Sequence, residues 1–243
     1  MIAQLLDSVH ILDTPQNIDA AYAAEVDWAQ GYRLNPDSRL LLLGASRLIA
    51  RLRHGEEGAN GNLDKFRTAL VLGSDFGSLS SYEVFHDSII AAEAPRPLGG
   101  ATARLDVAVS AAVHAMPSIP TAALSIRFGF HGPTITVSGE AEVGVMALRT
   151  ALMLLAQGRC DTALAGCWHM PSATTARAGL PASAQLLLIA LRRCAGRARP
   201  EDFPTWSEHR QGRSCVDVLA AWLALNRSAF EREFEPMMGV KSG

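Results

Sequence analysis

The sequence has little lysine, no excess of positive charge and no long apolar run, and each absence excludes a class of protein. Only Lys65 and Lys241 among its 22 basic residues are lysine, and the formal net charge is -2. Such a composition does not suggest nucleic-acid binding. The longest apolar stretches are interrupted well before the roughly 20 residues that span a bilayer. Residues 1–6 lack the basic segment and apolar core of a secretory signal, so we expect a cytoplasmic protein.

Cysteine is also scarce and is not arranged for metal binding. The four cysteines show no CxxC pairing and no histidine at zinc-finger spacing. They are Cys160, Cys167, Cys194 and Cys215. We expect buried free thiols in a reducing compartment, with no metal and no bound cofactor.

What the sequence does contain is apolar. It is 49% hydrophobic and 19% charged over 243 residues, enough for a sizeable core in one domain. Residues 66–72 read as a buried strand, followed by a glycine turn and a helix from about 80 to 92. Further strands are expected at 161–166 and 184–191. Residues 2–13 read as an opening strand or a short helix plus strand, and residues 168–182 read as a loop. Strand, glycine turn and helix in this order indicate an α/β fold. Other helices are expected at 17–28, 39–53, 121–128 and 216–230.

The stretch from 132 to 158 is the centre of this organisation. It reads as a short β-prone segment at 134–137, a break at Ser138 and Gly139, and a proline-free helix at 140–157. The helix is apolar on nearly every side, which is typical of a buried helix. A strand that breaks sharply into a buried helix is where several enzyme folds mount a nucleophile. Here the candidate position holds Ala141.

Four ordered motifs resemble the N-terminal half of β-ketoacyl synthases, the thiolase-like condensing enzymes. The motifs are TALVLGSDFGSLSSYEVFHDSI, SIPTAALSIRFGFHGPTITV, ALRTALMLLAQGRCDTALAGC and SAQLLLIAL. The resemblance covers about residues 38–194. It implies a thiolase-like half fold, an α/β domain with a mixed five-stranded sheet and helices on both faces. The whole chain, 1–243, would form this single domain, with a C-terminal helix at about 216–230.

The departures from the family bear on activity. Active members carry a pattern like D-T-A-C-S-S before the central helix, and the matching residues here run from Ser138 to Val143, with Ala141 at the cysteine position. A methyl group cannot attack a carbonyl, so condensing activity is not expected from this stretch. Family members also use two histidines, which lie in HGTGT-like and glycine-rich motifs of a C-terminal half. None of the seven histidines here lies in such a motif, so we expect this chain to lack both catalytic histidines. The resemblance therefore implies a non-catalytic subunit like a chain-length factor.

Two acids flank the lost nucleophile, and two interpretations of them stay open. The carboxylates of Glu140 and Glu142 could fill the anion-favouring place at the helix N-terminus and close it to substrate. Alternatively, they are acids that stabilise the helix dipole by about 0.3–1 kcal/mol each. A second set of residues aligns with the family's acyl tunnel, with ordinary core packing as the alternative. This tunnel set is His114, Met116, Pro117, Ile119 and Pro120. His131 is expected to flank the same channel, and His169 has no visible relay partner.

Half of such a fold is expected to need a partner. The central helix would leave an apolar face uncovered, partly covered by the helix at 216–230. The segment at 134–137 is predicted to be an edge strand that pairs across a dimer two-fold. Its residues are Thr134, Ile135, Thr136 and Val137. The resemblance implies a catalytic ketosynthase as partner, and an acyl carrier protein that brings the phosphopantetheine-bound substrate.

Two other functions remain open from the sequence. One is a stand-alone malonyl-carrier-protein decarboxylase or acyl hydrolase that uses Glu140, Glu142 or a histidine. The other is a scaffold that docks carrier protein through a basic run, for which a solvated surface is the alternative. The run is Arg192, Arg193, Arg197 and Arg199.

Overall fold

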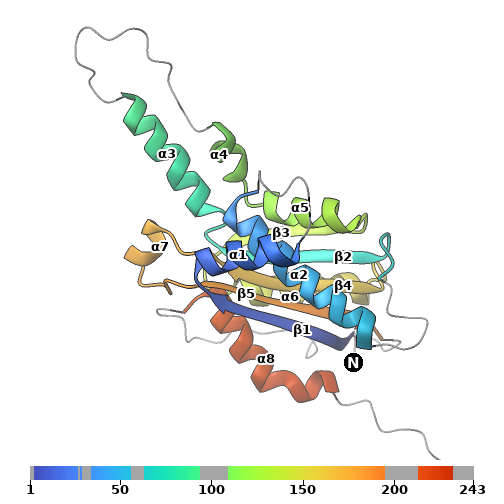
Figure 1. The fold of residues 1–243 in the computed structure, drawn as a ribbon. Coiled ribbons are helices and arrows are strands. Elements are labelled where there is room, and N and C mark those ends of the chain that lie inside the picture. The colour runs from blue at the N-terminus through green and yellow to red at the C-terminus, as the bar shows by residue number, and fades with distance from the viewer. Residues whose placement is uncertain are drawn as a thin grey trace, which may run out of the picture.

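The structure is a computed structural model, and it describes residues 3–26, 28, 34–55, 63–93, 109–194 and 213–231. Within these residues it contains five strands and eight helices (Figure 1). The strands are β1 (Ala3–Asp13), β2 (Thr68–Asp75), β3 (Thr134–Gly139), β4 (Thr162–His169) and β5 (Ala184–Arg193). The helices are α1 (Pro15–Glu25), α2 (Pro36–Gly55), α3 (Leu79–Glu93), α4 (Val109–His114), α5 (Ile119–Phe128), α6 (Val143–Ala156), α7 (Ala173–Arg177) and α8 (Cys215–Glu231).

The strands form one mixed sheet in the order β1-β5-β4-β2-β3. β2 is parallel to both β3 and β4, whereas β5 is antiparallel to β4 and to β1. Four strands therefore run in one direction and only β5 runs against them. The mixed five-stranded sheet expected from the sequence is confirmed. The carboxyl ends of β2, β3 and β4 meet at one end of the sheet, because Asp75 pairs with Gly139 and Ser74 with Trp168.

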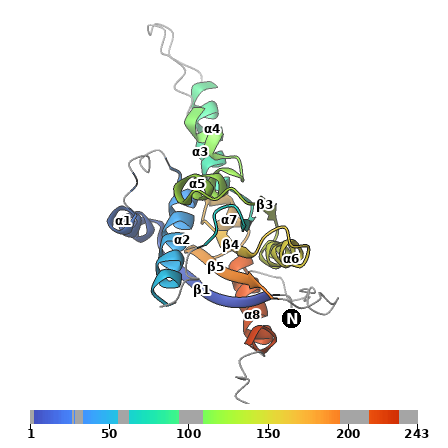
Figure 2. The same ribbon diagram turned by 90° about the vertical axis from the view of Figure 1, so that its right-hand side faces the viewer.

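Helices cover both faces of the sheet (Figures 1 and 2). α1, α2 and α5 lie on one face, and α6 and α8 on the other. β2 is buried at every position, and its side chains alternate between the two cores. Leu70 and Leu72 belong to the core under α2, and Ala69 and Val71 to the core under α6. This period of two is what a strand covered on both faces requires.

The central helix sits close to the sheet because small side chains meet it there. Ala163 and Ala165 of β4 contribute to the core under α6. Within α6 itself, a Cβ on Gly144 would come within 2.6 Å of the Cys167 sulfur and 3.0 Å of the Cys215 carbonyl. Glycine is therefore required at 144 by the approach of α6 to both β4 and α8.

Several sequence-based boundaries need correction. The helix expected at 140–157 spans 143–156, and Ser138 and Gly139, expected to be a break, continue β3 because they pair with Ser74 and Asp75. The region 168–182, expected to be a loop, begins inside β4 and contains α7. Residues 2–13, expected as a strand or a helix plus strand, form the single strand β1 from residue 3.

The central helix is also not buried on every side. Met146 and Met153 are 42% and 43% exposed, and both lie on one outward stripe of α6. The expected cover from the C-terminal helix is present, because Val216 and Leu219 of α8 are buried against α6. The central helix thus keeps an exposed apolar stripe on the side that α8 does not cover.

α3 and α4 form an arm that projects from the body of the molecule (Figure 1). Large apolar side chains are exposed along it. They are Tyr82, Val84 and Ile90 of α3, Val113 of α4, and Met116 just beyond α4. No helix in the described part of the chain is long and apolar enough to cross a membrane.

Candidate functional site

The candidate site is the junction between β3 and α6. After Gly139 the chain turns through Glu140, Ala141 and Glu142, and the Val143 N–H donates to the Glu140 carbonyl at 3.0 Å. Glu142 is the N-cap residue of α6. Its backbone angles are helical, and its side chain makes no capping hydrogen bond. The structure therefore places half-buried Ala141 in the strand-to-helix turn, where a nucleophile would be mounted.

The two acids at this junction differ in exposure. Glu140 is exposed, while Glu142 is half-buried, with its Oε1 atom buried. Both precede the first turn of α6 rather than lying within it. Because Glu140 points to solvent-accessible surface, Glu142 is the better placed of the two to occupy space at the helix start.

The tunnel set lies beside this junction. Pro117 follows α4 and comes so close to Gly77 that a Cβ there would lie 2.9 Å from the Pro117 ring and 3.5 Å from the Ser138 hydroxyl. The α4–α5 connection thus meets the end of β2 and the end of β3. Met116 and Pro117 are exposed, His114 and Ile119 are half-buried, and Pro120 is buried.

His114 ends α4 and its carbonyl accepts a hydrogen bond from the Asn35 amide at 3.2 Å. Its Nδ1 atom is buried and has no hydrogen-bond partner among the described residues.

By contrast, His131 lies at the start of β3 and stacks on Phe66, with ring centroids 5.0 Å apart. Because Ala141 follows the opposite end of β3, His131 does not flank the channel, and that expectation is wrong.

The backbone is strained where β2 ends at the junction. Phe76 has φ of 80°, the only positive value for a non-glycine among the described residues. Its N–H donates to the Gly139 carbonyl at 3.2 Å, which ties it to the end of β3. Such outliers cost of order 1–3 kcal/mol and cluster at functional sites. The strained backbone at Phe76 is a feature of the junction that the sequence did not predict.

β3 forms one edge of the sheet, since among the described strands it pairs only with β2. Its side chains alternate between the two faces: Thr134 and Thr136 bond to Ser125 and Thr121 of α5, at 3.3 and 2.9 Å. Ile135 and Val137 pack against the core under α6. The strand carries no proline or charge, so its outer backbone groups are not protected against pairing. Pairing across a dimer stays a prediction.

A buried polar cluster near the junction was not predicted. The imidazole of His169 lies 2.9 Å from the Asp75 carboxylate through Nδ1 and 3.0 Å from the Pro181 carbonyl through Nε2. Both neighbours accept hydrogen bonds, which favours the imidazolium form. Burial would lower the pKa of His169, but the hydrogen bond and charge of Asp75 outweigh it and raise the pKa. His169 therefore does have a partner, contrary to the sequence-based reading.

The same carboxylate also holds the start of α8. The other oxygen of Asp75 accepts the Cys215 backbone N–H at 3.1 Å, and the Cys215 thiol donates to the Trp168 carbonyl at 3.3 Å. His169 is fully buried and Asp75 nearly so. The pair thus links β2, β4 and α8, and it has no access to a substrate.

A second buried carboxylate lies on the other face of β4. Asp37, in the first turn of α2, accepts the Trp168 indole N–H at 2.9 Å and the Ser80 hydroxyl at 3.3 Å. Burial raises the pKa of Asp37 to about 6, against the opposing effect of these two hydrogen bonds. Trp168 and His169 therefore anchor opposite faces of β4 through two acids.

Two buried cysteines, Cys160 and Cys215, are poorly suited to replace the missing nucleophile. All four cysteines are free. Burial raises the pKa of Cys160 to about 11, and burial together with the neighbouring Cys167 thiol raises that of Cys215 well above its usual range. Thiols held protonated are poor nucleophiles. No group of three or more metal-ligating side chains occurs in the described part of the chain.

Part of the basic run lies at the opposite end of the sheet from the junction. Arg193 ends β5 and contacts Asp161 at 3.3 Å, and Asp161 also binds Arg67 at 2.9 Å. Arg197 and Arg199 lie outside the described residues. Arg193 is therefore engaged in a surface ion-pair network with Asp161 and Arg67.

The comparisons with known proteins agree with this architecture. The model of the β-ketoacyl synthase N-terminal domain family matches residues 11–195. Since that is well over half of the sequence, the chain belongs to this family. A search of curated protein sequences gives no match.

Solved structures with the same fold include three ketosynthases. The ishigamide ketosynthase/chain length factor superposes with a TM-score of 0.58 at 19% identity, covering 82% of this chain and 64% of that one. A β-ketoacyl synthase from Burkholderia phymatum STM815 gives 0.57 at 14% identity, covering 79% and 59%. The AntDE:AntF complex of a type II polyketide synthase, in which a carrier protein binds its ketosynthase, gives 0.55 at 14%, covering 79% and 63%. The chain therefore spans less than two thirds of each, and at these identities the likeness shows the fold.

Proposed function

We propose that this chain is a non-catalytic subunit, like a chain-length factor, that pairs with a catalytic β-ketoacyl synthase. In that complex it shapes the acyl tunnel for fatty acid, polyketide or polyene assembly. The growing chain is carried on the phosphopantetheine arm of an acyl carrier protein. The observation that carries the proposal is Ala141, a methyl group in the strand-to-helix turn of a ketosynthase-family fold.

The chemistry of the junction supports a role without covalent catalysis. An acyl-transfer nucleophile needs an ionisable or hydroxyl side chain next to a base. Ala141 has neither, and Cys160 and Cys215 are buried thiols with raised pKa values. The pair of His169 and Asp75 is also buried, so it has a structural rather than a catalytic environment.

The described surface around the junction supports pairing. The β3 edge is unprotected, and Met116 and the arm of α3 and α4 expose apolar side chains. Large exposed apolar patches mark protein interfaces, and these side chains supply apolar surface for one. A partner that covers it would bring its own side chains to the tunnel set between α4 and α5.

Co-expression with a catalytic β-ketoacyl synthase from the same source tests the pairing. We expect a 1:1 complex by size-exclusion chromatography with light scattering. Met116→Glu should weaken the complex, because Met116 is 49% exposed beside the junction. Leu12→Glu is the matched control, since Leu12 is 61% exposed on β1, at the other edge of the sheet. The proposal would be overturned if the chain remained a stable monomer and formed no complex with any ketosynthase tested.

A further inference from the structure

A cavity of about 380 Å³ lies between α3 and α7, apart from the β3–α6 junction. α3 follows β2 and α7 follows β4, so the cavity lies beyond the carboxyl ends of two adjacent parallel strands. Open α/β sheets bind ligands in this position. The volume falls within the range of small-molecule pockets, about 300–1,000 Å³.

One acid of the cavity is already satisfied by the protein. Glu83 accepts the backbone N–H groups of Ala173 and Thr174 at 3.1 and 2.7 Å. Burial would raise the pKa of Glu83, but hydrogen bonds from Thr174 and Ser172 outweigh it and lower the pKa. Glu83 therefore stays ionised and holds α7 against α3, which fixes the shape of the cavity.

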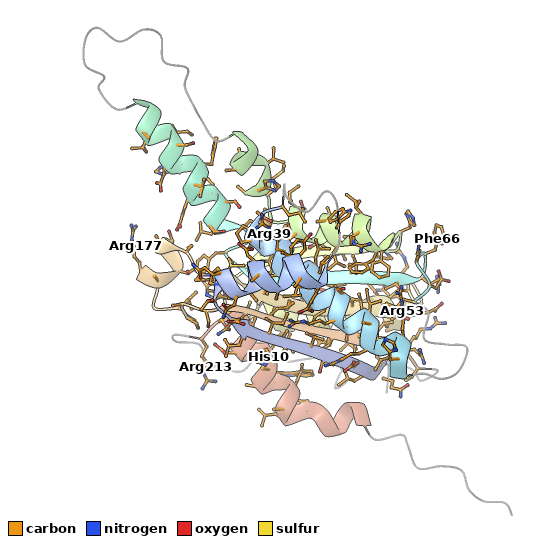
Figure 3. All side chains as sticks on the ribbon, viewed as in Figure 1. His10, Arg39, Arg53, Phe66, Arg177 and Arg213 are labelled. Atoms are coloured by element: carbon orange, nitrogen blue, oxygen red, sulfur yellow. The ribbon has the colours of Figure 1, made fainter. Side chains whose placement is uncertain are left out.

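One cation of the cavity has no partner among the described residues. Arg177, at the end of α7, lines the cavity and makes no hydrogen bond or ion pair with any described residue. Figure 3 shows its side chain rising from α7 on the side toward α3. The second acid, Asp87, is 83% exposed in its side chain and lies 3.7 Å from His86 instead. An unpaired guanidinium that faces a cavity favours an anion, and it binds carboxylates through two parallel N–H donors.

The opposite wall of the cavity is flat and aromatic. Tyr82 and His86 lie one turn apart on α3, and their rings stack with centroids 6.3 Å apart and planes 24° apart. Leu79, one turn before Glu83, adds an apolar contact. Tyr82 is 53% exposed, so the face of its ring that is turned away from His86 is open to a flat ligand.

We propose that the cavity between α3 and α7 binds a small organic carboxylate with a flat conjugated or aromatic body. Arg177 holds the carboxylate, and the outer face of the Tyr82 ring, backed by His86, receives the flat body. Neither Ala141 nor any residue of the tunnel set lines this cavity, and the proposal does not depend on pairing with a ketosynthase.

Cinnamate is a suitable probe because it joins a carboxylate to a flat conjugated body. We expect its titration into the 243-residue chain at pH 7, followed by NMR, to shift the amides of residues 79–87 and 173–177 in a saturable manner. Arg177→Gln should raise the dissociation constant roughly tenfold or more, the effect of losing a charge-assisted hydrogen bond. Tyr82→Ala should also weaken binding, whereas Tyr82→Phe should keep it.

Two controls make the outcome decisive. Arg149→Gln removes an exposed arginine from α6, away from the cavity, and should leave cinnamate binding unchanged. Cinnamamide has the same shape without the charge and should bind at least roughly tenfold more weakly. The proposal is overturned if cinnamate gives no saturable shifts, if the amide binds as well as the acid, or if Arg177→Gln binds cinnamate as the unchanged chain does. Preferential binding of benzylamine would also overturn it, since it would show a site for cations.

Discussion

Asp37 gives the fold a pH dependence whose sign and size follow from its burial. Its side chain is fully buried, and its pKa rises from 3.8 to about 6 in the folded protein. Between these two values the folded chain binds more protons at this site than the unfolded chain. Stability from this group is therefore fully present below pH 3.8 and is lost as the pH rises through about 6. A shift of about two units corresponds to roughly 3 kcal/mol.

Asp37→Asn removes this titration while keeping the shape of the side chain. The amide oxygen can still accept the Trp168 indole N–H, and the amide N–H₂ can donate to the Ser80 hydroxyl. We expect the variant to gain stability relative to the unchanged chain as pH rises from about 4 to about 7, by up to roughly 3 kcal/mol in all.

Urea unfolding at several pH values, followed by far-UV circular dichroism, measures this difference. Asp87→Asn is the control, because it makes the same substitution at an exposed acid on α3. The reasoning would be refuted if the difference between Asp37→Asn and the unchanged chain were flat with pH, or if it ran in the opposite direction.

Two further predictions concern the packing and strain around the junction, and a third concerns the acyl tunnel. Phe76→Gly should be about 1 kcal/mol more stable than Phe76→Ala, because both lose the same exposed ring but only alanine keeps the cost of φ at 80°; equal melting temperatures would contradict the strain. Gly144→Ala should destabilise by about 1–3 kcal/mol, because the added Cβ meets the Cys167 sulfur at 2.6 Å; an unchanged thermal unfolding midpoint would show that α6 can move away. In a complex with a catalytic ketosynthase, Met116→Trp should shorten the acyl product detected by mass spectrometry. An unchanged product profile would remove Met116 from the tunnel.

The sequence predicts the order of the helices and strands more accurately than the residues at which they begin and end. Residues 134–137 were recognisable as a strand because they are β-prone, but Ser138 and Gly139 read as a break. They extend β3 only because Ser74 and Asp75 of β2 lie beside them and supply the ladder. These partners in β2 lie about 60 residues earlier in the chain, so no local sequence pattern indicates the pairing. The same holds for the expected start of α6 at Glu140.

The buried cluster around His169 is a feature that the sequence alone did not predict. Asp75 and His169 are 94 residues apart and meet because β2 and β4 end side by side. A signal was present, since each is a polar residue three positions beyond a predicted apolar strand. Reading it required the strand order, which composition does not give. The outward stripe of α6 was missed for a different reason: Met146 and Met153 are apolar yet exposed, so hydrophobicity alone could not separate the two faces.

The central claim is that this chain works beside a nucleophile that it does not supply. The most direct measurement is the intact mass of both subunits after the purified complex is incubated with an acyl-loaded carrier protein. The account predicts an acyl adduct on the catalytic ketosynthase and none on this chain, and no acetyl product from malonyl carrier protein when this chain is incubated without its partner. An acyl adduct on this chain, or decarboxylation by the chain alone that Glu140→Gln or Glu142→Gln abolishes, would contradict it.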